Sequence, residues 1–255
     1  MSAFSRAIVV IPTYNERDNI EPLLTAIFAL KIGVAVLVVD DHSPDGTADV
    51  VIRLQQSYPQ QLHLLSRPQK EGLGRAYLAG FGWALAYGYD YICSMDADFS
   101  HAPTDLPRLL AMCATPTVDI VIGSRYIPGG RVVNWPLSRI LLSSLANWLA
   151  RFITAMPIKD VTAGFVCYRR AILEDILHRP LSTPKLPLAI ASQKRSIAAV
   201  GYSFQVEIKF LAHQYGAKLV ELPITFVNRA RGKSKMGLRM AAESFLWLMQ
   251  MRWKS

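Results

Sequence analysis

The amino-acid sequence predicts an α/β protein with a mostly parallel sheet that carries helices on both faces. Through residue 125, short apolar runs alternate with segments that have the apolar spacing of helices. The apolar runs are almost unbroken, as in "AIVVIP" at 7–12, so each strand should be buried on both of its faces. Polar clusters follow these runs, and open α/β sheets bind their ligands beyond the carboxyl ends of their strands.

Strands and helices are distinguished in this sequence by length and by the spacing of apolar residues. The strand segments are short and rich in Val, Ile and Leu, whereas Ile20, Leu23, Leu24 and Ile27 recur at helical intervals. In chain order we expect strands at 6–12, 34–41, 62–67, 89–98 and 118–125, and helices at 19–30, 46–58, 72–88 and 104–114.

The second half of the chain is less regular. Residues 160–170 indicate a strand that enters a helix, and residues 203–216 indicate a helix. Residues 217–229 have the pattern of an extended pair bent at Pro223. Residues 178–199 contain three prolines and several basic residues, and we expect a long loop or insertion there.

Composition and charge limit the classes of protein to consider. The 255 residues are 51% hydrophobic, which suffices for a core in one large domain or in one domain with a small appendage and argues against disorder. Lys and Arg outnumber Asp and Glu by 28 to 19, a formal net charge of +9. An anionic partner is therefore expected: nucleic acid, an acidic membrane surface or a phosphorylated substrate.

The cysteines and the N-terminus predict a reducing compartment. Cys93, Cys113 and Cys167 are far apart within apolar segments, as is typical of buried free thiols. Residues 1–16 lack a basic region followed by a long apolar stretch, so no secretory signal is evident.

The segment most similar to a membrane span is residues 137–156. Arg139 and Arg151 interrupt it, whereas a crossing needs roughly 20 largely uncharged residues. Each central Arg would cost about 2.5–3.5 kcal/mol on insertion scales. We therefore expect a buried or interfacial helix.

Two carboxylates, Asp96 and Asp98, end the predicted strand 89–98 with only Ala97 between them. Once the strand has ended, this spacing can direct both to one side, where two unit charges about 4 Å apart repel by about 4 kcal/mol at an effective dielectric of about 20. A cation or a raised pKa must offset that repulsion. So few oxygen ligands suit Mg²⁺ or Mn²⁺, which complete their coordination with water and substrate phosphates.

Further acidic residues follow the strand 34–41. In a parallel sheet Asp40 and Asp41 would converge on the same edge as Asp96 and Asp98. For Asp41 or Asp45 alone, capping of the next helix is an equal alternative.

Three more segments admit a functional and a plainer interpretation. The glycines of residues 70–82 mimic a phosphate-cradling loop but do not have the spacing of the dinucleotide fingerprint. Residues 228–237 gather four basic side chains, which form either a solvated loop or a clamp over phosphates. Residues 236–255 interleave Phe and Trp with Leu, Met, Arg and Lys, which predicts either a last helix packed on the core or an interfacial helix on an anionic bilayer.

Eight motifs, in order along the chain, resemble those of the family-2 inverting glycosyltransferases, and within them the polyprenol- or dolichol-phosphate mannosyltransferases. They run from Ile8 to Lys235 and read "VVIPTYNE", "VVDDHSPDGT", "EGLGRAY", "MDADFSH", "GSRY", "DVTAGFVCYRR", "YSFQVEI" and "FVNRARGKSKMG". The resemblance implies the GT-A fold, a Rossmann-like nucleotide-binding sheet, with a catalytic domain at 1–235. The amphipathic helix at 236–255 is expected from its residue pattern and not from the resemblance. The resemblance also implies metal-dependent transfer of mannose from GDP-mannose to a polyprenyl or dolichyl phosphate, as in dolichyl-phosphate β-D-mannosyltransferases.

The resemblance assigns roles to individual residues. The guanosine part of GDP-mannose would be bound by Pro12, Tyr14, Glu16 and Asp40. The remaining donor-nucleotide residues would be Asp41, Lys70, Gly74, Asp96, Ala97, Asp98 and Ser234. The ligands of Mg²⁺ or Mn²⁺ would be Asp96, Asp98 and Ser100. Arg125 would face the acceptor phosphate or sugar, Glu207 would lie by the sugar, and Arg229, Ser234 and Lys235 would close over the phosphates.

Two features depart from the family pattern. Many bacterial and archaeal relatives have Gln as a further metal ligand where this chain has Ser100, as eukaryotic-like members do. The segment between "YRR" and "YSFQVEI" is also longer and richer in Pro and Lys. Because no membrane domain follows Lys235, we expect a free-standing catalytic subunit in the cytoplasm, in peripheral contact with the cytoplasmic face of an anionic membrane, with or without a separate membrane subunit.

Two alternatives predict other ligands. A UDP-sugar such as UDP-glucose could replace GDP-mannose as the donor to the same lipid phosphate. A nucleic-acid-binding module would use the net charge of +9. The acidic strand ends would repel that ligand, and aromatic stacking platforms are not obvious beside the basic residues, so we expect no nucleic-acid partner.

Overall fold

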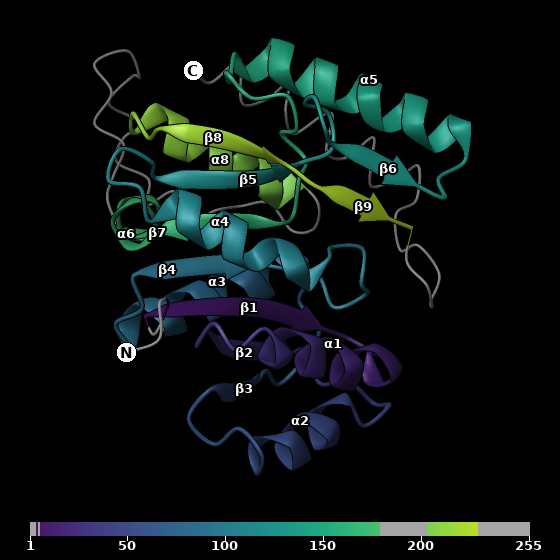
Figure 1. Ribbon diagram of the computed structural model, residues 1–255, viewed down its shortest axis with the longest axis vertical. Helices are drawn as coiled ribbons and strands as arrows, with labels where there is room; N and C mark the ends of the chain where they lie inside the picture. The colour runs from purple at the N-terminus through teal and green to yellow at the C-terminus, as the bar shows by residue number, and fades with distance from the viewer. Residues whose placement is uncertain (1–3, 5, 179–202, 229–255) are drawn as a thin grey trace.

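The computed structural model describes residue 4, residues 6–178 and residues 203–228. A seven-stranded sheet in the order β3-β2-β1-β4-β7-β5-β8 crosses the molecule, and helices lie on both of its faces (Figure 1). Its strands are β1 (Ala7–Thr13), β2 (Ala35–Asp40), β3 (Leu62–Ser66), β4 (Tyr91–Ser94), β5 (Ile120–Ser124), β7 (Val166–Arg169) and β8 (Leu219–Pro223). The helices are α1 (Arg17–Ala29), α2 (Thr47–Gln55), α3 (Leu73–Ala86), α4 (Leu106–Cys113) with the short η1 (Pro103–Asp105) before it, α5 (Leu137–Thr154), α6 (Arg170–His178) and α8 (Ser203–Gln214).

The predicted mostly parallel sheet is confirmed, with one strand reversed. β1 pairs in parallel with β2 and β4, β2 with β3, and β5 with β8, whereas β7 runs antiparallel between β4 and β5. A two-stranded parallel sheet of β6 (Arg131–Val133) and β9 (Thr225–Val227) was not predicted. A run buried on both faces has the same apolar pattern in either direction, so the sequence predicted the strand β7 but not its orientation.

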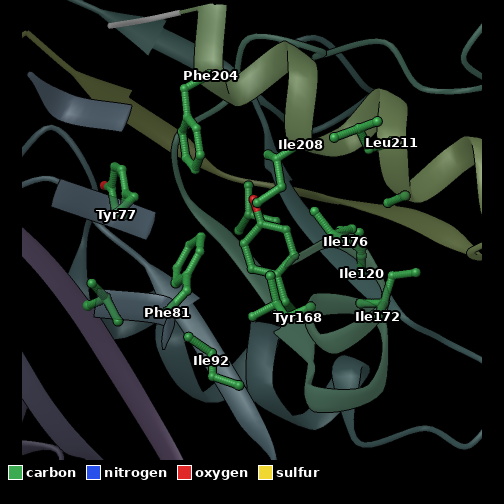
Figure 2. Close-up of a cluster of buried hydrophobic side chains, with 14 of the residues drawn as sticks. Tyr77, Phe81, Ile92, Ile120, Tyr168, Ile172, Ile176, Phe204, Ile208 and Leu211 are labelled. Atoms are coloured by element: carbon green, nitrogen blue, oxygen red, sulfur yellow. The ribbon is translucent and has the colours of Figure 1, made fainter. Parts of the chain in front are cut away.

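The core consists of two clusters, one on each face of the sheet. Along β1, Ile8 and Val10 belong to the cluster under α3, α6 and α8, and Val9 and Ile11 to the cluster under α1, α2 and α4. Figure 2 shows the first cluster, in which aromatic side chains of α3 and α8 meet those of β7. The alternation of side chains along a strand therefore produces two buried faces.

The predicted helices and strands of the first half are present within a few residues of their expected ends. The helix at 203–216 and the bent pair at 217–229 are also confirmed, as α8 and as β8 followed by β9. The expected loop at 178–199 lies outside the described residues from 179 onward. The basic loop from 229, the predicted end of the catalytic domain at 235 and the predicted C-terminal helix at 236–255 also lie outside them.

The helix expected at 137–156 is present as α5, and its buried residues are Asn147, Ala150 and Thr154. Several of its large apolar side chains are exposed, so the buried alternative is wrong for most of its surface. Within residues 4, 6–178 and 203–228, the helices lack the combination of length and apolar character that a bilayer crossing requires.

The three cysteines are buried and unbridged, as predicted. Cys93 and Cys167 face each other in the register of β4 and β7, and the Sγ of Cys113 lies 3.7 Å from the Cys167 carbonyl oxygen. Burial, followed by contacts with the other two thiols, raises the pKa of Cys167 well above its usual value.

Two glycines of α3 differ in the space around them. A Cβ at Gly80 would lie 2.4 Å from Val10 Cγ1 and 3.0 Å from Val39 Cγ2, whereas a Cβ at Gly82 would meet nothing within 4 Å. Gly80 therefore allows α3 to approach β1 and β2 closely, which is a packing role and not phosphate binding.

We expect Gly80→Ala to destabilise the protein by about 1–3 kcal/mol, because the added methyl group overlaps the buried sheet. Gly82→Ala, on the same helix, should be neutral or stabilising by up to about 1 kcal/mol, because alanine is the better helix former. Urea denaturation of both variants measures the difference; equal effects would contradict the close packing at Gly80.

Candidate active site

The carboxyl ends of β1, β2 and β4 meet at one edge of the sheet. Thr13 at the end of β1 is in register with Asp40 at the end of β2, and Ser94 of β4 is in register with Val10. Asp96 comes two residues after Ser94, the last residue of β4. Asp96 and Asp40 therefore lie at the same edge of the sheet. The predicted convergence of the acidic strand ends is confirmed.

The acidic residues after β2 have protein partners. Asp40 is 1% exposed, and its carboxylate accepts hydrogen bonds from Thr13 Oγ1 (2.8 Å) and from the backbone N–H (2.9 Å) and Oγ (2.6 Å) of Ser43. Asp41 pairs with Arg67 Nη1 at 2.7 Å, and burial raises the pKa of Asp41 although Arg67 acts against it. The N-cap position of α2 is Gly46, so neither Asp41 nor Asp45 is the N-cap residue; Asp45, just before it, accepts the N–H of Thr47 at 3.0 Å and so satisfies one free donor of the first turn.

Two of the residues predicted to bind guanosine, Tyr14 and Glu16, lie in the loop after β1, whereas Pro12 is within β1 and Asp40 ends β2. Tyr14 has the Lys70 ammonium 3.8 Å from its ring centroid, a cation–π contact that brings the loops after β1 and β3 together. The Glu16 N–H donates to Thr47 Oγ1 at 3.0 Å, and the Glu16 carboxylate accepts from Asn19 Nδ2 at 2.9 Å. Pro12 is paired within β1, and Gly74 is buried in the first turn of α3. Their nucleotide-binding roles stay predictions.

Asp96 and Asp98 follow β4 in different surroundings. Asp96 is half-buried and accepts a hydrogen bond from the Tyr77 hydroxyl at 3.1 Å. Burial first, and then Asp96, raises the pKa of Tyr77 well above its usual value, which keeps the phenol protonated as a donor. Asp98 is 7% exposed and accepts the Ser100 N–H at 3.0 Å, and Ser100 is itself buried.

His101 and Gln205 are polar residues of the quoted motifs that the sequence reasoning did not assign. His101 is 2% exposed between the rings of Phe165 and Phe226, and its Nδ1 has no hydrogen-bond partner in the described structure. Burial lowers the pKa of His101 to about 4, although Asp98 acts against it, so its imidazole is neutral at pH 7. Gln205 Oε1 is likewise buried without a partner in that part of the chain, and its amide reaches toward Gly164 beside Asp96. Both residues stand among other polar side chains in their motifs, "MDADFSH" and "YSFQVEI", so no sequence pattern singled them out.

The donor atoms beside β4 fit a divalent cation that is held jointly by protein and substrate. Within the described residues, no group of three His, Cys, Asp or Glu side chains is arranged to hold a metal by itself. The two carboxylates would supply oxygen ligands only, and Mg²⁺ or Mn²⁺ then takes the others from water and phosphate. Ser100 as a third protein ligand stays a prediction.

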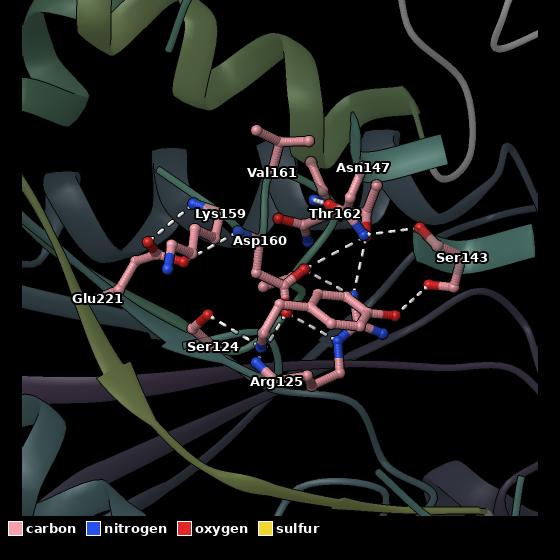
Figure 3. A network of polar contacts seen from close by, with 12 residues as sticks. Ser124, Arg125, Ser143, Asn147, Lys159, Asp160, Val161, Thr162 and Glu221 are labelled. Carbon is pink, nitrogen blue, oxygen red and sulfur yellow. Dashed lines mark hydrogen bonds and ion pairs between the residues drawn. The ribbon is translucent and has the colours of Figure 1, made fainter. Parts of the chain in front are cut away.

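Arg125, directly after β5, is bound to Asp160 by a nearly buried ion pair (Figure 3). Its Nε and Nη2 donate to the two Asp160 carboxylate oxygens at 2.8 and 2.7 Å, and its backbone N–H donates to Oδ2 at 2.9 Å. Burial acts to lower the pKa of Arg125, but the charge and hydrogen bonds of Asp160 outweigh it and raise that pKa. The Asp160 carboxylate is 0% exposed, so the pair is fixed geometrically.

The ion pair is the centre of a larger polar network. Arg125 Nη2 also donates to Thr162 Oγ1 at 2.8 Å, and Asn147 of α5 exchanges two hydrogen bonds with Thr162. The Asp160 N–H donates to the Glu221 carboxylate of β8 at 2.9 Å. The segment 160–164 is thereby connected to β5, α5 and β8 (Figure 3).

Lys209 fixes the same segment from α8. Its Nζ is fully buried and donates to the carbonyl oxygens of Val161 (3.0 Å), Ala163 (2.7 Å) and Gln205 (2.8 Å). Burial lowers the pKa of Lys209 to about 7, but three carbonyl acceptors match the three N–H donors of the ammonium form. Glu207, 9% exposed, leaves α8 on the side away from Gln205 and Lys209, and its role beside the sugar stays a prediction.

The remaining predicted residues, Arg229, Ser234 and Lys235, lie outside the described residues. The site that the structure does describe therefore joins the loop after β1, the Asp96 and Asp98 pair, and the Arg125 network.

We expect Asp160→Ala to lower the free energy of unfolding by about 3–5 kcal/mol, because it leaves the Arg125 charge nearly buried and unpaired. Asp90→Ala is the matched control, since Asp90 pairs with Arg6 at the exposed surface and its loss should cost about 0–1 kcal/mol. Urea denaturation measures both; similar losses would show that the Arg125 pair is not a buried one.

Comparison with known proteins gives a consistent result. Residues 8–177 match the model of Glycosyl transferase family 2. The chain is 44% identical to the polyprenol monophosphomannose synthase of Mycolicibacterium smegmatis over 231 residues, which cover 91% of this chain and 81% of the relative. It is 41% identical to the undecaprenyl-phosphate mannosyltransferase of Micrococcus luteus over 253 residues, which cover 98% and 96%.

Solved structures share the fold. The glucosyl-3-phosphoglycerate synthase of Mycobacterium tuberculosis, in complex with Mn²⁺, UDP and glucosyl-3-phosphoglycerate, aligns with a TM-score of 0.65 at 19% identity, over 96% of this chain and 79% of the other. The mannosyltransferase PcManGT of Pyrobaculum calidifontis, in complex with GDP-Man and Mn²⁺, aligns with a TM-score of 0.61 at 18% identity, over 98% and 64%.

Proposed function

Because the chain belongs to glycosyl transferase family 2 and has the GT-A fold, we propose that it transfers mannose from GDP-mannose to a polyprenyl phosphate of the dolichyl type. The observation that carries this proposal is the position of Asp96 and Asp98 at the sheet edge that also holds Asp40. The names of the two relatives above support the lipid acceptor, and the GDP-Man complex of PcManGT supports the donor.

The donor would lie along the strand ends, with guanosine near Tyr14 and Asp40 and the diphosphate near Asp96 and Asp98. A divalent cation held by these two carboxylates would offset the charge that develops on the leaving GDP. Arg229 and Lys235 would stabilise the same charge more in the transition state than in the ground state. Tyr77 would orient Asp96 through its hydrogen bond.

The acceptor would approach from the side of Arg125. Among the described residues, Asp160 and Thr162 take the Nε and Nη2 donors, which leaves Nη1 as the group that would meet a phosphate oxygen. The lipid phosphate is already ionised at neutral pH, so the reaction needs positioning and not a strong general base. Attack on the anomeric carbon opposite the diphosphate would break its bond to GDP and invert α to β.

We expect Asp98→Ala to reduce mannosyl transfer by about 100-fold or more, because it removes one of two carboxylates from the diphosphate site. The assay follows radiolabelled GDP-mannose into extracted polyprenyl-phosphate mannose, with NMR of the anomeric proton to check inversion. Asp49→Ala, which removes an exposed carboxylate from α2, is the control and should be fully active. Full activity of a folded Asp98→Ala variant with added MnCl₂ would contradict the assignment.

A UDP-sugar donor is the second candidate, and thermal shifts separate the two. With GDP and Mn²⁺ at about 100 times the Kd, binding should add about 2.7 kcal/mol of stability and raise Tm, and EDTA should reduce that gain. UDP should give a smaller shift under the same conditions. A larger shift with UDP would favour UDP-glucose as the donor, and no shift with either would contradict a nucleotide-sugar site.

A further inference from the structure

The outward side of α5 is an exposed apolar surface. Its large side chains are between 51% and 74% exposed, and they are Leu137, Leu141, Leu142, Leu145, Trp148 and Phe152. Since a helix turns about 100° per residue, these residues lie opposite the buried residues Asn147, Ala150 and Thr154. Figure 1 places α5 at the outside of the molecule, at the top of the view beyond β5 and β6. We name the six exposed residues the α5 outer face.

The composition of α5 shows what such a face would bind. Leu, Trp and Phe on one side of a helix together with Arg are typical of helices that lie in the interface of an anionic bilayer. Arg139 and Arg151 are the charged residues of α5, which contains no Asp or Glu. Arg139 donates to Asn228 Oδ1 at 2.8 Å and lies over the Trp135 ring on the inward side, so Arg151, which is exposed, is the basic residue that flanks the apolar side chains. Trp148 and Phe152 stack at 5.9 Å between ring centroids, so the two rings form a continuous apolar surface.

Net charge separates a membrane from a second copy as the occupant. The chain carries a formal net charge of +9. Two copies brought together would repel each other, whereas the anionic headgroups of a bilayer attract basic residues. Six large apolar side chains exposed on one side of a helix are more than the scattered apolar residues of an ordinary surface, and such a group marks an interaction site. We propose that the α5 outer face docks the protein on an anionic bilayer.

The inward side of α5 connects this face to the candidate acceptor site. Ser143 accepts a hydrogen bond from the Tyr126 hydroxyl at 2.7 Å, and Asn147 bonds to Thr162, which in turn bonds to Arg125. A helix is about 10 Å thick, so docking would hold Arg125 roughly one helix diameter from the headgroups. This positional consequence rests on the proposed function, because it takes the acceptor to be a lipid phosphate.

The test is flotation with vesicles of phosphatidylcholine, with or without phosphatidylglycerol. The wild type should float with the anionic vesicles, and the double variant Leu145→Glu/Trp148→Glu should bind at least about tenfold less. Ile52→Glu/Tyr87→Glu is matched to it in charge and in exposed apolar residues, but lies on α2 and at the end of α3, and should float as the wild type does. Should the glutamates unfold the protein, Leu145→Ser/Trp148→Ser provides the same comparison.

Three results would overturn the docking inference. The first is a wild type that does not bind anionic vesicles, and the second is a folded α5 variant that binds them as the wild type does. The third is a dimer, detected by light scattering, that the α5 variant dissociates without any effect on vesicle binding.

Transfer assays separate this inference from the proposed function. The α5 variant should keep wild-type transfer to a short, water-soluble polyprenyl phosphate and lose transfer to a long-chain acceptor embedded in vesicles. If the wild type uses neither acceptor while flotation still depends on α5, the proposed function fails and the docking surface stands. Wild-type transfer to the embedded acceptor by the α5 variant would overturn the link between the helix and catalysis.

Discussion

The parallel pairing of β1 with both β2 and β4 is the constraint on which the candidate site depends. Each of these strands enters the core from the same direction, so each must leave it at the same edge. Polar residues, which the two buried clusters would not tolerate, stand at the ends of these strands or directly after them. They include Tyr14, Asp40 and Asp96. The fold thus concentrates acidic side chains without any requirement that they be close in sequence.

The acceptor side of the site depends on a different kind of interaction. Asp160 is buried, and its carboxylate is satisfied by Arg125, while Lys209 holds the neighbouring backbone carbonyls. Removing water from these charges is costly, so such a network persists only where its geometry is well satisfied. Thr162 Oγ1 accepts from both Arg125 and Asn147, so one residue connects the guanidinium to the surface helix α5.

Much of the fold could be predicted from the sequence because its signals are local. Unbroken apolar runs and the spacing of Ile20, Leu23, Leu24 and Ile27 indicated the strands and α1. The direction of β7 could not be predicted, since burial on both faces leaves the same pattern in a strand of either direction. β6 has only three residues, too few for a periodic signal.

Only the part of the candidate site that has a local signal could be predicted from the sequence. Two carboxylates separated by a single residue, such as Asp96 and Asp98, are conspicuous because their repulsion needs an explanation. His101 and Lys209 were missed because their significance arises only when distant segments pack around them, Phe165 and Phe226 in one case and the carbonyls of Val161 and Ala163 in the other.

The thiols at the centre of the sheet have a practical consequence. Cys93 and Cys167 face each other between β4 and β7, Cys113 lies against the same strand from α4, and the chain contains no other cysteine. A thiol reagent in solution can therefore label Cys93 or Cys167 only after the centre of the sheet has opened locally, and Cys113 only after α4 has moved away from it. The rate at which such a reagent modifies these cysteines therefore measures how often the centre of the molecule opens.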